Sequence, residues 1–81
     1  MITIKTFAQI REISGRAELT IKWQADMTVD NLMKQLALQD AAWANAFTAN
    51  VLIAVNQTMC NAQQKLNDND EVAFFPPVTG G

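Results

Sequence analysis

Residues 27–40, MTVDNLMKQLALQD, carry the pattern that decides the fold. Four apolar side chains in this stretch recur at the three- and four-residue spacing that lines one face of a helix: Val29, Leu32, Met33 and Leu36. Thr28 can cap the first turn, and Asp30 places negative charge near the positive end of the helix dipole. The stretch therefore predicts one principal helix whose apolar stripe faces a core.

The segments on both sides of this helix predict β-strands. Residues 2–7 (ITIKTF) and 18–23 (ELTIKW) alternate apolar and polar side chains, the period of a strand with one buried face. Residues 50–58 (NVLIAVNQT) hold a nearly unbroken apolar run, typical of a strand buried on both faces, and this strand is expected to be central. The last strand, residues 71–75 (EVAFF), ends at Pro76 because proline cannot donate to a sheet ladder.

The connections are predicted from their turn-forming and helical residues. Residues 7–15 (FAQIREISG) predict one or two helical turns that end at Gly15, and residues 41–47 (AAWANAF) predict another short helix. The polar segment around Met59 and Cys60 is expected to be irregular. Four charged residues near the following turn are expected to be solvated: Lys65, Asp68, Asp70 and Glu71. Both tryptophans, Trp23 and Trp43, are interpreted as packing residues.

This order of elements predicts an α+β fold of the β-grasp type, which is the ubiquitin-like architecture. A mixed sheet of four to five strands is expected to carry the principal helix packed on one face. The predicted domain covers residues 1–76, and residues 77–81 are expected to form a flexible C-terminal tail that ends in a diglycine.

Composition excludes several classes of function. With 81 residues, 49% hydrophobic and 17% charged, the chain is expected to fold as one small domain. Its six Lys and Arg residues are scattered and the net charge is -2, so neither composition nor charge favours nucleic-acid binding. No continuous apolar stretch opens the chain, so we expect no signal peptide, no membrane span and a cytoplasmic location.

The chain also lacks the side chains of many catalytic and metal sites. It has no histidine and one cysteine, which excludes Ser-His and Cys-His nucleophilic catalysis, histidine metal ligands and multi-cysteine metal sites. No metal site is therefore predicted. Cys60 is interpreted as a small, half-buried apolar residue, with a reactive thiol as the alternative.

The C-terminal residues 71–81, EVAFFPPVTGG, are the strongest candidates for function, because two of the three glycines in the chain occupy the last two positions. Pro76 and Pro77 favour an extended start to the tail, and the four residues after Pro77 can reach roughly 13 to 14 Å. A Gly80-Gly81 end can pass a channel too narrow for other residues. The α-carboxylate of Gly81 is a poor electrophile, so its reaction requires activation, most simply by ATP to an acyl adenylate.

Three motifs together resemble a known family. FAQIREISG (residues 7–15), AVNQT (54–58) and DNDEVAFFPPVTGG (68–81) are similar to the small, sulfur-carrying subunits of molybdopterin synthase, the MoaD family of ubiquitin-like β-grasp carriers. The resemblance covers essentially the whole chain. Asn69 stands where relatives often have glycine, so a positive φ is expected at this position, and asparagine tolerates it.

The resemblance implies a role as a sulfur carrier. Gly81 would be adenylated by an ATP-dependent activating enzyme similar to ubiquitin-activating (E1-like) enzymes and then converted to a thiocarboxylate. That sulfur would go to cyclic pyranopterin monophosphate to form the molybdopterin dithiolene. The partner would be the large catalytic subunit of the synthase, in a heterotetramer of two small and two large subunits. This chain would be a co-substrate and subunit more than a catalyst, with no permanently bound cofactor.

Partner contacts are expected at the base of the tail. Neighbouring side chains of a strand point to opposite faces, so we interpret Phe74 as core and Phe75 as available to a partner. Pro76 and three residues of the tail would extend this docking surface: Pro77, Val78 and Thr79. Arg11, which matches an arginine of the family, would pair with an acidic group on the partner, or instead with Glu12 or another acid of this chain.

Two other classes of function remain open from the sequence. The chain could donate sulfur to thiamine thiazole or to tRNA, or could join its terminus to lysines as a ubiquitin-like protein modifier. It could also be a binding domain without covalent chemistry.

Overall fold

The computed structural model describes residues 1–7, 10–12, 15, 18–48 and 50–76. The elements follow the order β1 (Ile2–Thr6), β2 (Glu18–Ile21), α2 (Val29–Gln39), α3 (Ala41–Ala46), β3 (Leu52–Val55), β4 (Thr58–Cys60) and β5 (Glu71–Phe75). Residues 10–12, between β1 and β2, are helical. The predicted tail, residues 77–81, lies outside the described residues, as does Ile13 of the predicted short helix.

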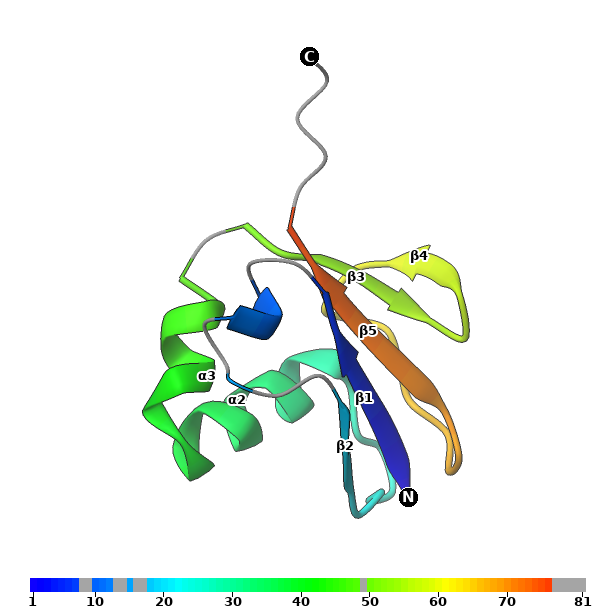
Figure 1. The fold of residues 1–81 in the computed structure, drawn as a ribbon. Coiled ribbons are helices and arrows are strands. Elements are labelled where there is room, and N and C mark those ends of the chain that lie inside the picture. Colours follow the sequence, from blue (N-terminus) through cyan, green and yellow to red (C-terminus); the bar gives the residue numbers. More distant parts are fainter. Residues whose placement is uncertain (8–9, 13–14, 16–17, 49, 77–81) are drawn as a thin grey trace.

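The strands form one mixed sheet in the order β2-β1-β5-β3-β4. β1 and β5 are parallel, and the other neighbouring pairs are antiparallel. Both labelled helices lie on the same side of this sheet (Figure 1). The prediction of a mixed sheet with one principal helix on one face is confirmed, with five strands in the described chain.

Helix α2 begins where its sequence predicts, after Thr28. Thr28 is the N-cap, and its side-chain oxygen accepts a hydrogen bond from the Asn31 backbone N–H at 3.2 Å. The Asn31 side chain accepts from the Thr28 N–H at 3.0 Å, which completes a capping box. Asp40 ends α2 and caps α3, because its carboxylate accepts from the Ala42 N–H at 2.9 Å. This shared cap holds the two helices end to end.

The core fills the space between the helices and the sheet. Three residues of the predicted helical stripe are fully buried: Val29, Leu32 and Leu36. The alternating residues of the two parallel strands meet them and are also fully buried: Ile2, Ile4, Val72 and Phe74. An aromatic series crosses the core, with ring centroids 5.6 Å apart for Trp43 and Phe47 and 5.0 Å apart for Phe47 and Phe74. These contacts anchor the strand that precedes the tail.

Both tryptophans pack as predicted. Trp43 is buried, with 2% of its surface exposed. Trp23 is partly buried against the core and donates its indole N–H to the Leu66 carbonyl at 2.8 Å. Satisfying this polar group lets the large ring cover the core near the end of β2.

The prediction for the segment around Met59 and Cys60 was wrong. It is not irregular but forms the edge strand β4, which pairs antiparallel with β3. Asn56 and Gln57 connect the two strands with φ values of 50° and 68°, the positive backbone angles that a tight two-residue hairpin requires. β3 is an interior strand, buried at Ile53, Ala54 and Val55, but the strand at the centre of the sheet is β5.

The prediction that Asp70 is a solvated turn residue was also wrong. Its side chain is buried, with 8% exposure, and its carboxylate accepts from the Asn56 side-chain amide at 2.8 Å and from the Asn67 N–H at 2.7 Å. Asn56 also accepts from the Glu71 N–H at 3.0 Å. The Asn56–Asp70 pair therefore joins the β3–β4 turn to the first residue of β5.

Two turn residues adopt the left-handed backbone expected of them. Gly15 has a φ of 76° and donates its N–H to the Arg11 carbonyl at 2.9 Å. Asn69 has a φ of 73°, as its place in the motif predicts, and donates its N–H to the Met1 carbonyl at 3.0 Å. The Met1 α-amino group pairs with the exposed carboxylate of Asp68, and this hydrogen bond lowers the pKa of Asp68. The turn before β5 is thus tied to the start of β1.

Candidate functional site

The base of the predicted tail is the carboxyl end of β5, where two adjacent phenylalanines have different environments. Phe74 is fully buried among the core residues, in line with Val72, as predicted. Phe75 points to the opposite face of the sheet and is half-buried. The strand therefore presents one aromatic ring to the core and one to the outer surface, directly before Pro76.

A second exposed aromatic residue lies beside this strand end. The backbone N–H of Phe7 donates to the Phe74 carbonyl at 3.2 Å, which extends the parallel β1–β5 ladder by one residue. Because Thr6 is buried on the core face, the alternation of side chains places Phe7 on the outer face, where its side chain is 49% exposed. Phe7 belongs both to the strand predicted over residues 2–7 and to the helical spacing predicted over residues 7–15, and neither pattern identified it as an exposed residue of the outer face.

Apolar side chains continue across the outer face of the sheet. The register pairs Phe75 with Leu52, and pairs Ala54 with both Ala73 and Met59. Leu52 is half-buried, Ala54 is buried and Met59 is 54% exposed. We call this surface the outer apolar patch, and its members are Phe7, Leu52, Ala54, Met59, Ala73 and Phe75.

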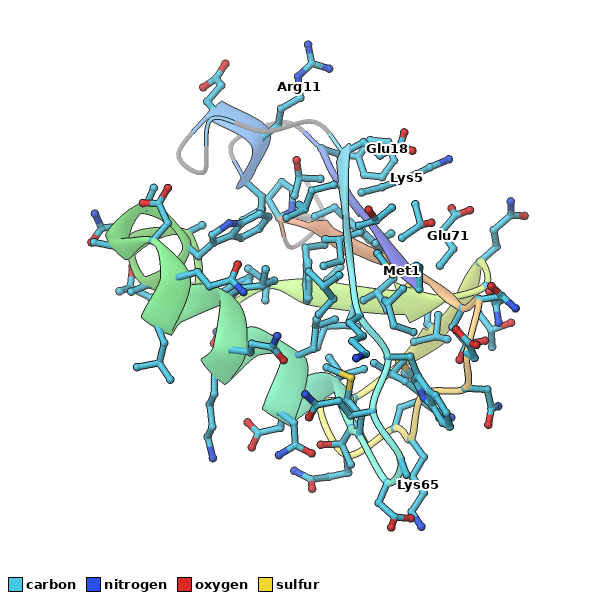
Figure 2. All side chains as sticks on the ribbon, turned by 90° about the horizontal axis from the view of Figure 1, so that it is seen from below. Met1, Lys5, Arg11, Glu18, Lys65 and Glu71 are labelled. Carbon is cyan, nitrogen blue, oxygen red and sulfur yellow. The ribbon has the colours of Figure 1, made fainter. Side chains whose placement is uncertain are left out.

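The two labelled helices leave the outer apolar patch uncovered, because they lie on the other face of the sheet (Figure 1). A charged pair borders the patch: Lys5 lies beside Ala73 in the register of β1 and β5, and its ammonium is 3.6 Å from the Glu71 carboxylate. Figure 2 shows Lys5 and Glu71 side by side on this part of the sheet. An apolar centre with a polar rim is the usual composition of a protein–protein contact surface.

The patch lies within reach of the predicted reactive end. Pro76 is half-buried, and the five residues after it span at most roughly 16 to 18 Å when fully extended. A partner that holds the α-carboxylate of Gly81 must therefore come within this distance of Pro76, the residue that follows Phe75. Five predicted site residues themselves lie outside the described part of the chain: Pro77, Val78, Thr79, Gly80 and Gly81.

Arg11 is presented from the short helical segment that follows Phe7. The Phe7 carbonyl accepts from the Ile10 and Arg11 N–H groups at 3.2 and 3.4 Å, and buried Ile10 anchors the turn in the core. Arg11 is exposed, and Figure 2 shows its side chain projecting from the body, at the end of the molecule opposite Lys65. Its contact with a partner stays a prediction.

The described side chains offer little chemistry of their own. In the described ranges, no group of three or more His, Cys, Asp or Glu residues could hold a metal ion, and no helix is long and apolar enough to cross a membrane. Cys60 is half-buried against the core, as predicted, and burial raises the pKa of its thiol. A raised pKa disfavours the reactive thiolate at neutral pH.

The fold defines a class of protein. The arrangement is that of the ubiquitin-like β-grasp proteins, and the crystal structure of SAMP1 from Haloferax volcanii is similar to it, with a TM-score of 0.82 and 23% identity over 99% of this chain and 98% of that chain. The sequence model of the ThiS family matches residues 4–81, and the chain belongs to this family.

Two further similarities are more particular. The chain is 46% identical over 83 residues to the molybdopterin synthase sulfur carrier subunit of Escherichia coli (strain K12), and the match covers 100% of both chains. The fold is also similar to a chain in the protein–protein complex of subunits 1 and 2 of molybdopterin-converting factor from Helicobacter pylori 26695. That similarity has a TM-score of 0.69 and 22% identity over 99% of this chain and 97% of that chain.

Proposed function

We propose that this chain is the sulfur carrier subunit of a molybdopterin synthase. The observation that carries the proposal is the 46% identity to the E. coli sulfur carrier subunit over the full length of both chains. The β-grasp fold agrees with this role, because its central strand β5 ends directly before Pro76, from which the sequence continues to the terminal diglycine.

The reacting group in this proposal is the α-carboxylate of Gly81. It is ionised at neutral pH and is a poor electrophile, so an E1-like partner first joins it to the AMP portion of ATP with release of pyrophosphate. A sulfur nucleophile then displaces AMP and leaves a thiocarboxylate on Gly81. ATP is thus a substrate of the activating partner, and this chain holds no resident cofactor. The proposed location is the cytoplasm, where ATP for the activation step is available.

The acceptor in this proposal is cyclic pyranopterin monophosphate bound to the large subunit. Each thiocarboxylate supplies one sulfur atom, so two carriers are consumed to build one dithiolene. The chain has no histidine and its one thiol is half-buried, so the large subunit would supply the acid and base groups for the transfer. In this proposal the chain donates the sulfur atom and the large subunit catalyses its transfer.

Docking on the large subunit would use the outer apolar patch. The patch lies next to the start of the tail, and its exposed Phe7, Met59 and half-buried Phe75 offer the apolar anchors typical of such contacts. The solved complex of subunits 1 and 2 from H. pylori supports a large-subunit partner. Pro76 to Thr79 and Arg11 would extend the contact, and two carriers would bind two large subunits in a heterotetramer.

A direct test follows the sulfur atom. The carrier is incubated with ATP, an E1-like activating enzyme and a sulfur source, and intact-mass spectrometry should show replacement of one oxygen by sulfur at the C-terminus. Mixing this product with the large subunit and the cyclic pterin should return the original mass and form molybdopterin. Failure of the charged carrier to convert the pterin would contradict the proposal.

Other sulfur acceptors form the second candidate, because the chain matches the ThiS family as a whole. In that case the same thiocarboxylate would form, but its sulfur would go to thiamine thiazole or to tRNA. Competition between the three acceptors for one charged carrier separates these roles. Conjugation of the C-terminus to protein lysines would be detected in the same mixture as a mass increase on the target proteins.

A further inference from the structure

The free edge of β2 has a definite hydrogen-bonding pattern. In β1, the backbone N–H of Thr3 donates to the Asp70 carbonyl at 3.0 Å, and the N–H of Phe7, just after β1, donates to the Phe74 carbonyl at 3.2 Å. Both bonds point toward β5. The N–H and C=O groups of successive residues point to opposite sides of a strand. The backbone groups of Ile2 and Ile4 therefore point toward β2, where Ile2 pairs with Ile21 and Ile4 pairs with Leu19.

The alternate residues of β2 therefore direct their backbone groups away from the sheet. These are Glu18, Thr20 and the residue that follows the strand, Lys22. All three are exposed, and β2 is a terminal strand of the sheet in the described chain. Figure 1 shows β2 at the edge beside β1. The edge presents N–H and C=O groups that another strand can pair with.

The residues on this edge are complementary to themselves. In ELTIK, residues 18–22, an antiparallel copy centred on Thr20 places Glu18 opposite Lys22 and Leu19 opposite Ile21. Directly opposed residues lie on the same face, so both charged pairs would lie on the outer face and both apolar pairs on the helix side.

We propose that two copies of this chain pair through β2, in antiparallel orientation and with Thr20 opposite Thr20. Six backbone hydrogen bonds join the copies, two at each opposed pair of outward-facing residues, because such pairs exchange both N–H···O bonds. Two ion pairs between Glu18 and Lys22 flank the centre. The interface is isologous, so both copies use the same surface.

Charge fixes the register of this pairing. Charged side chains on an edge strand normally oppose pairing with other chains, but here they favour one alignment. A slip of two residues brings Glu18 opposite Thr20 and loses both ion pairs. The pattern thus selects the second copy over strands of unrelated sequence.

A groove beside β2 accommodates the apolar pairs. It has a volume of about 530 Å³, and residues that line it from the two sides include Leu19, Ile21, Gln35, Gln39 and Trp43. Leu19 is half-buried in the single chain and lies on this helix side. In the pair, Leu19 of each copy lies against Ile21 of the other and covers the groove beside it.

The pairing is independent of the proposed sulfur chemistry. β2 and β4 are the two opposite edges of the sheet, so the second copy leaves β4 and the outer apolar patch accessible. The two-fold axis reverses the direction of β5 in the second copy, so the two C-termini leave the paired sheet in opposite directions. A ten-stranded sheet formed in this way can present both carriers to their partners.

The test is the oligomeric state of the full-length chain. Sedimentation velocity from about 1 µM to about 1 mM should show a concentration-dependent shift from monomer to dimer. Glu18→Lys or Lys22→Glu creates two like-charge pairs and should raise the dimer dissociation constant by about tenfold or more. Glu12→Lys, which makes the same charge change as Glu18→Lys at an exposed residue outside β2, is the matched control and should leave it unchanged.

Mixing the two edge variants provides the sharpest result. Glu18→Lys and Lys22→Glu should each be largely monomeric, whereas their equimolar mixture should form a heterodimer, because both cross-strand pairs again join opposite charges. Circular dichroism melts check that each variant is folded. If Glu18→Lys is destabilised by its cross-strand neighbour Lys5, the dimer dissociation constant of Lys22→Glu alone tests the ion pairs. A wild-type chain that stays monomeric at the highest concentration, a folded Lys22→Glu that dimerises as well as the wild type, or a mixture of the two folded variants that does not associate, overturns the proposal.

Discussion

The backbone N–H of Phe7 donates to the carbonyl of Phe74 at 3.2 Å, and this bond sets two strands in register at the point where the tail begins. The Phe74 side chain is buried in the core, and the Phe75 side chain is half-buried on the outer face of the sheet. At this strand end, the Phe74 ring therefore stabilises the fold, and the Phe75 ring is available to contact a partner. Mutation of Phe75 should therefore affect partner binding, whereas mutation of Phe74 should affect the stability of the fold.

Phe75→Ala should weaken binding to the large subunit by about ten- to a hundredfold, because burial of such a side chain at an interface is worth about 1.5 to 3 kcal/mol. Sulfur transfer should persist when the large subunit is saturating. Phe74→Ala should instead cost about 3 to 5 kcal/mol of folding free energy. Titration calorimetry and urea denaturation measure the two effects.

Leu38→Ala is the matched control for this pair of variants. Leu38 is 89% exposed on α2, on the other side of the sheet, so its removal should alter neither binding nor stability appreciably. Unchanged binding of Phe75→Ala would place the docking surface elsewhere on the molecule.

Chain length at the C-terminus should decide whether activation occurs. Deleting Gly81, or adding one alanine after it, moves the carboxylate by one residue, about 3.3 to 3.6 Å in an extended chain. ATP-pyrophosphate exchange with the activating enzyme should be lost in both variants, while thermal melts stay unchanged. Normal exchange by the lengthened chain would rule out the proposed mechanism.

Gly80→Ala should reduce sulfur transfer more than it reduces stability. The added methyl group would clash in a partner channel shaped for glycine, whereas a residue beyond the end of β5 is expected to contribute little to the free energy of folding. Single-turnover conversion of the pterin and thermal melts should therefore change independently. A fall in melting temperature as large as the fall in activity would assign Gly80 a structural role instead.

Asp70→Ala should destabilise the fold by about 1 to 3 kcal/mol, because it leaves the Asn56 amide and the Asn67 N–H without their acceptor in a partly buried turn. Asp70→Asn, which keeps one acceptor oxygen, should cost less. Urea denaturation measures both, with the exposed Glu12→Ala as the control. Equal stability of Asp70→Ala and the control would mean that water replaces the carboxylate at no cost.

Local patterns predicted most of the fold because they encode burial directly. The spacing of Val29, Leu32 and Leu36 determined helix α2, and the alternation in EVAFF correctly separated Phe74 from Phe75. Strand β4 was missed because it has no buried residue and its turn, Asn56-Gln57, lacks the glycine that usually indicates a hairpin. Asp70 was misassigned although it shares the even-numbered face of Val72 and Phe74, which extends the buried alternation by one position.

The outer apolar patch depends on contacts that no local pattern contains. Phe7, Leu52 and Met59 belong to three different segments, and only the register of β1, β5, β3 and β4 brings them onto one surface. The sequence identified Phe75 because it lies next to the diglycine tail. Its neighbours could be found only after the order of the strands was known, since sheet pairing joins residues far apart in the chain.

Cys60→Ala should retain sulfur transfer, because the proposed sulfur-bearing atom is the terminal carbon of Gly81 and the Cys60 thiol is half-buried.

The Cys60→Ala variant should nevertheless change the pH dependence of stability. Burial raises the pKa of Cys60, so the unfolded chain loses this proton at lower pH than the folded chain does. Between these two pKa values the folded state binds more protons, and stability falls as pH rises. Urea denaturation across the alkaline range should therefore show a steeper loss in the wild-type chain than in Cys60→Ala. Parallel curves would mean that the thiol has the same pKa in both states, and loss of sulfur transfer in the variant would instead assign Cys60 a part in the chemistry.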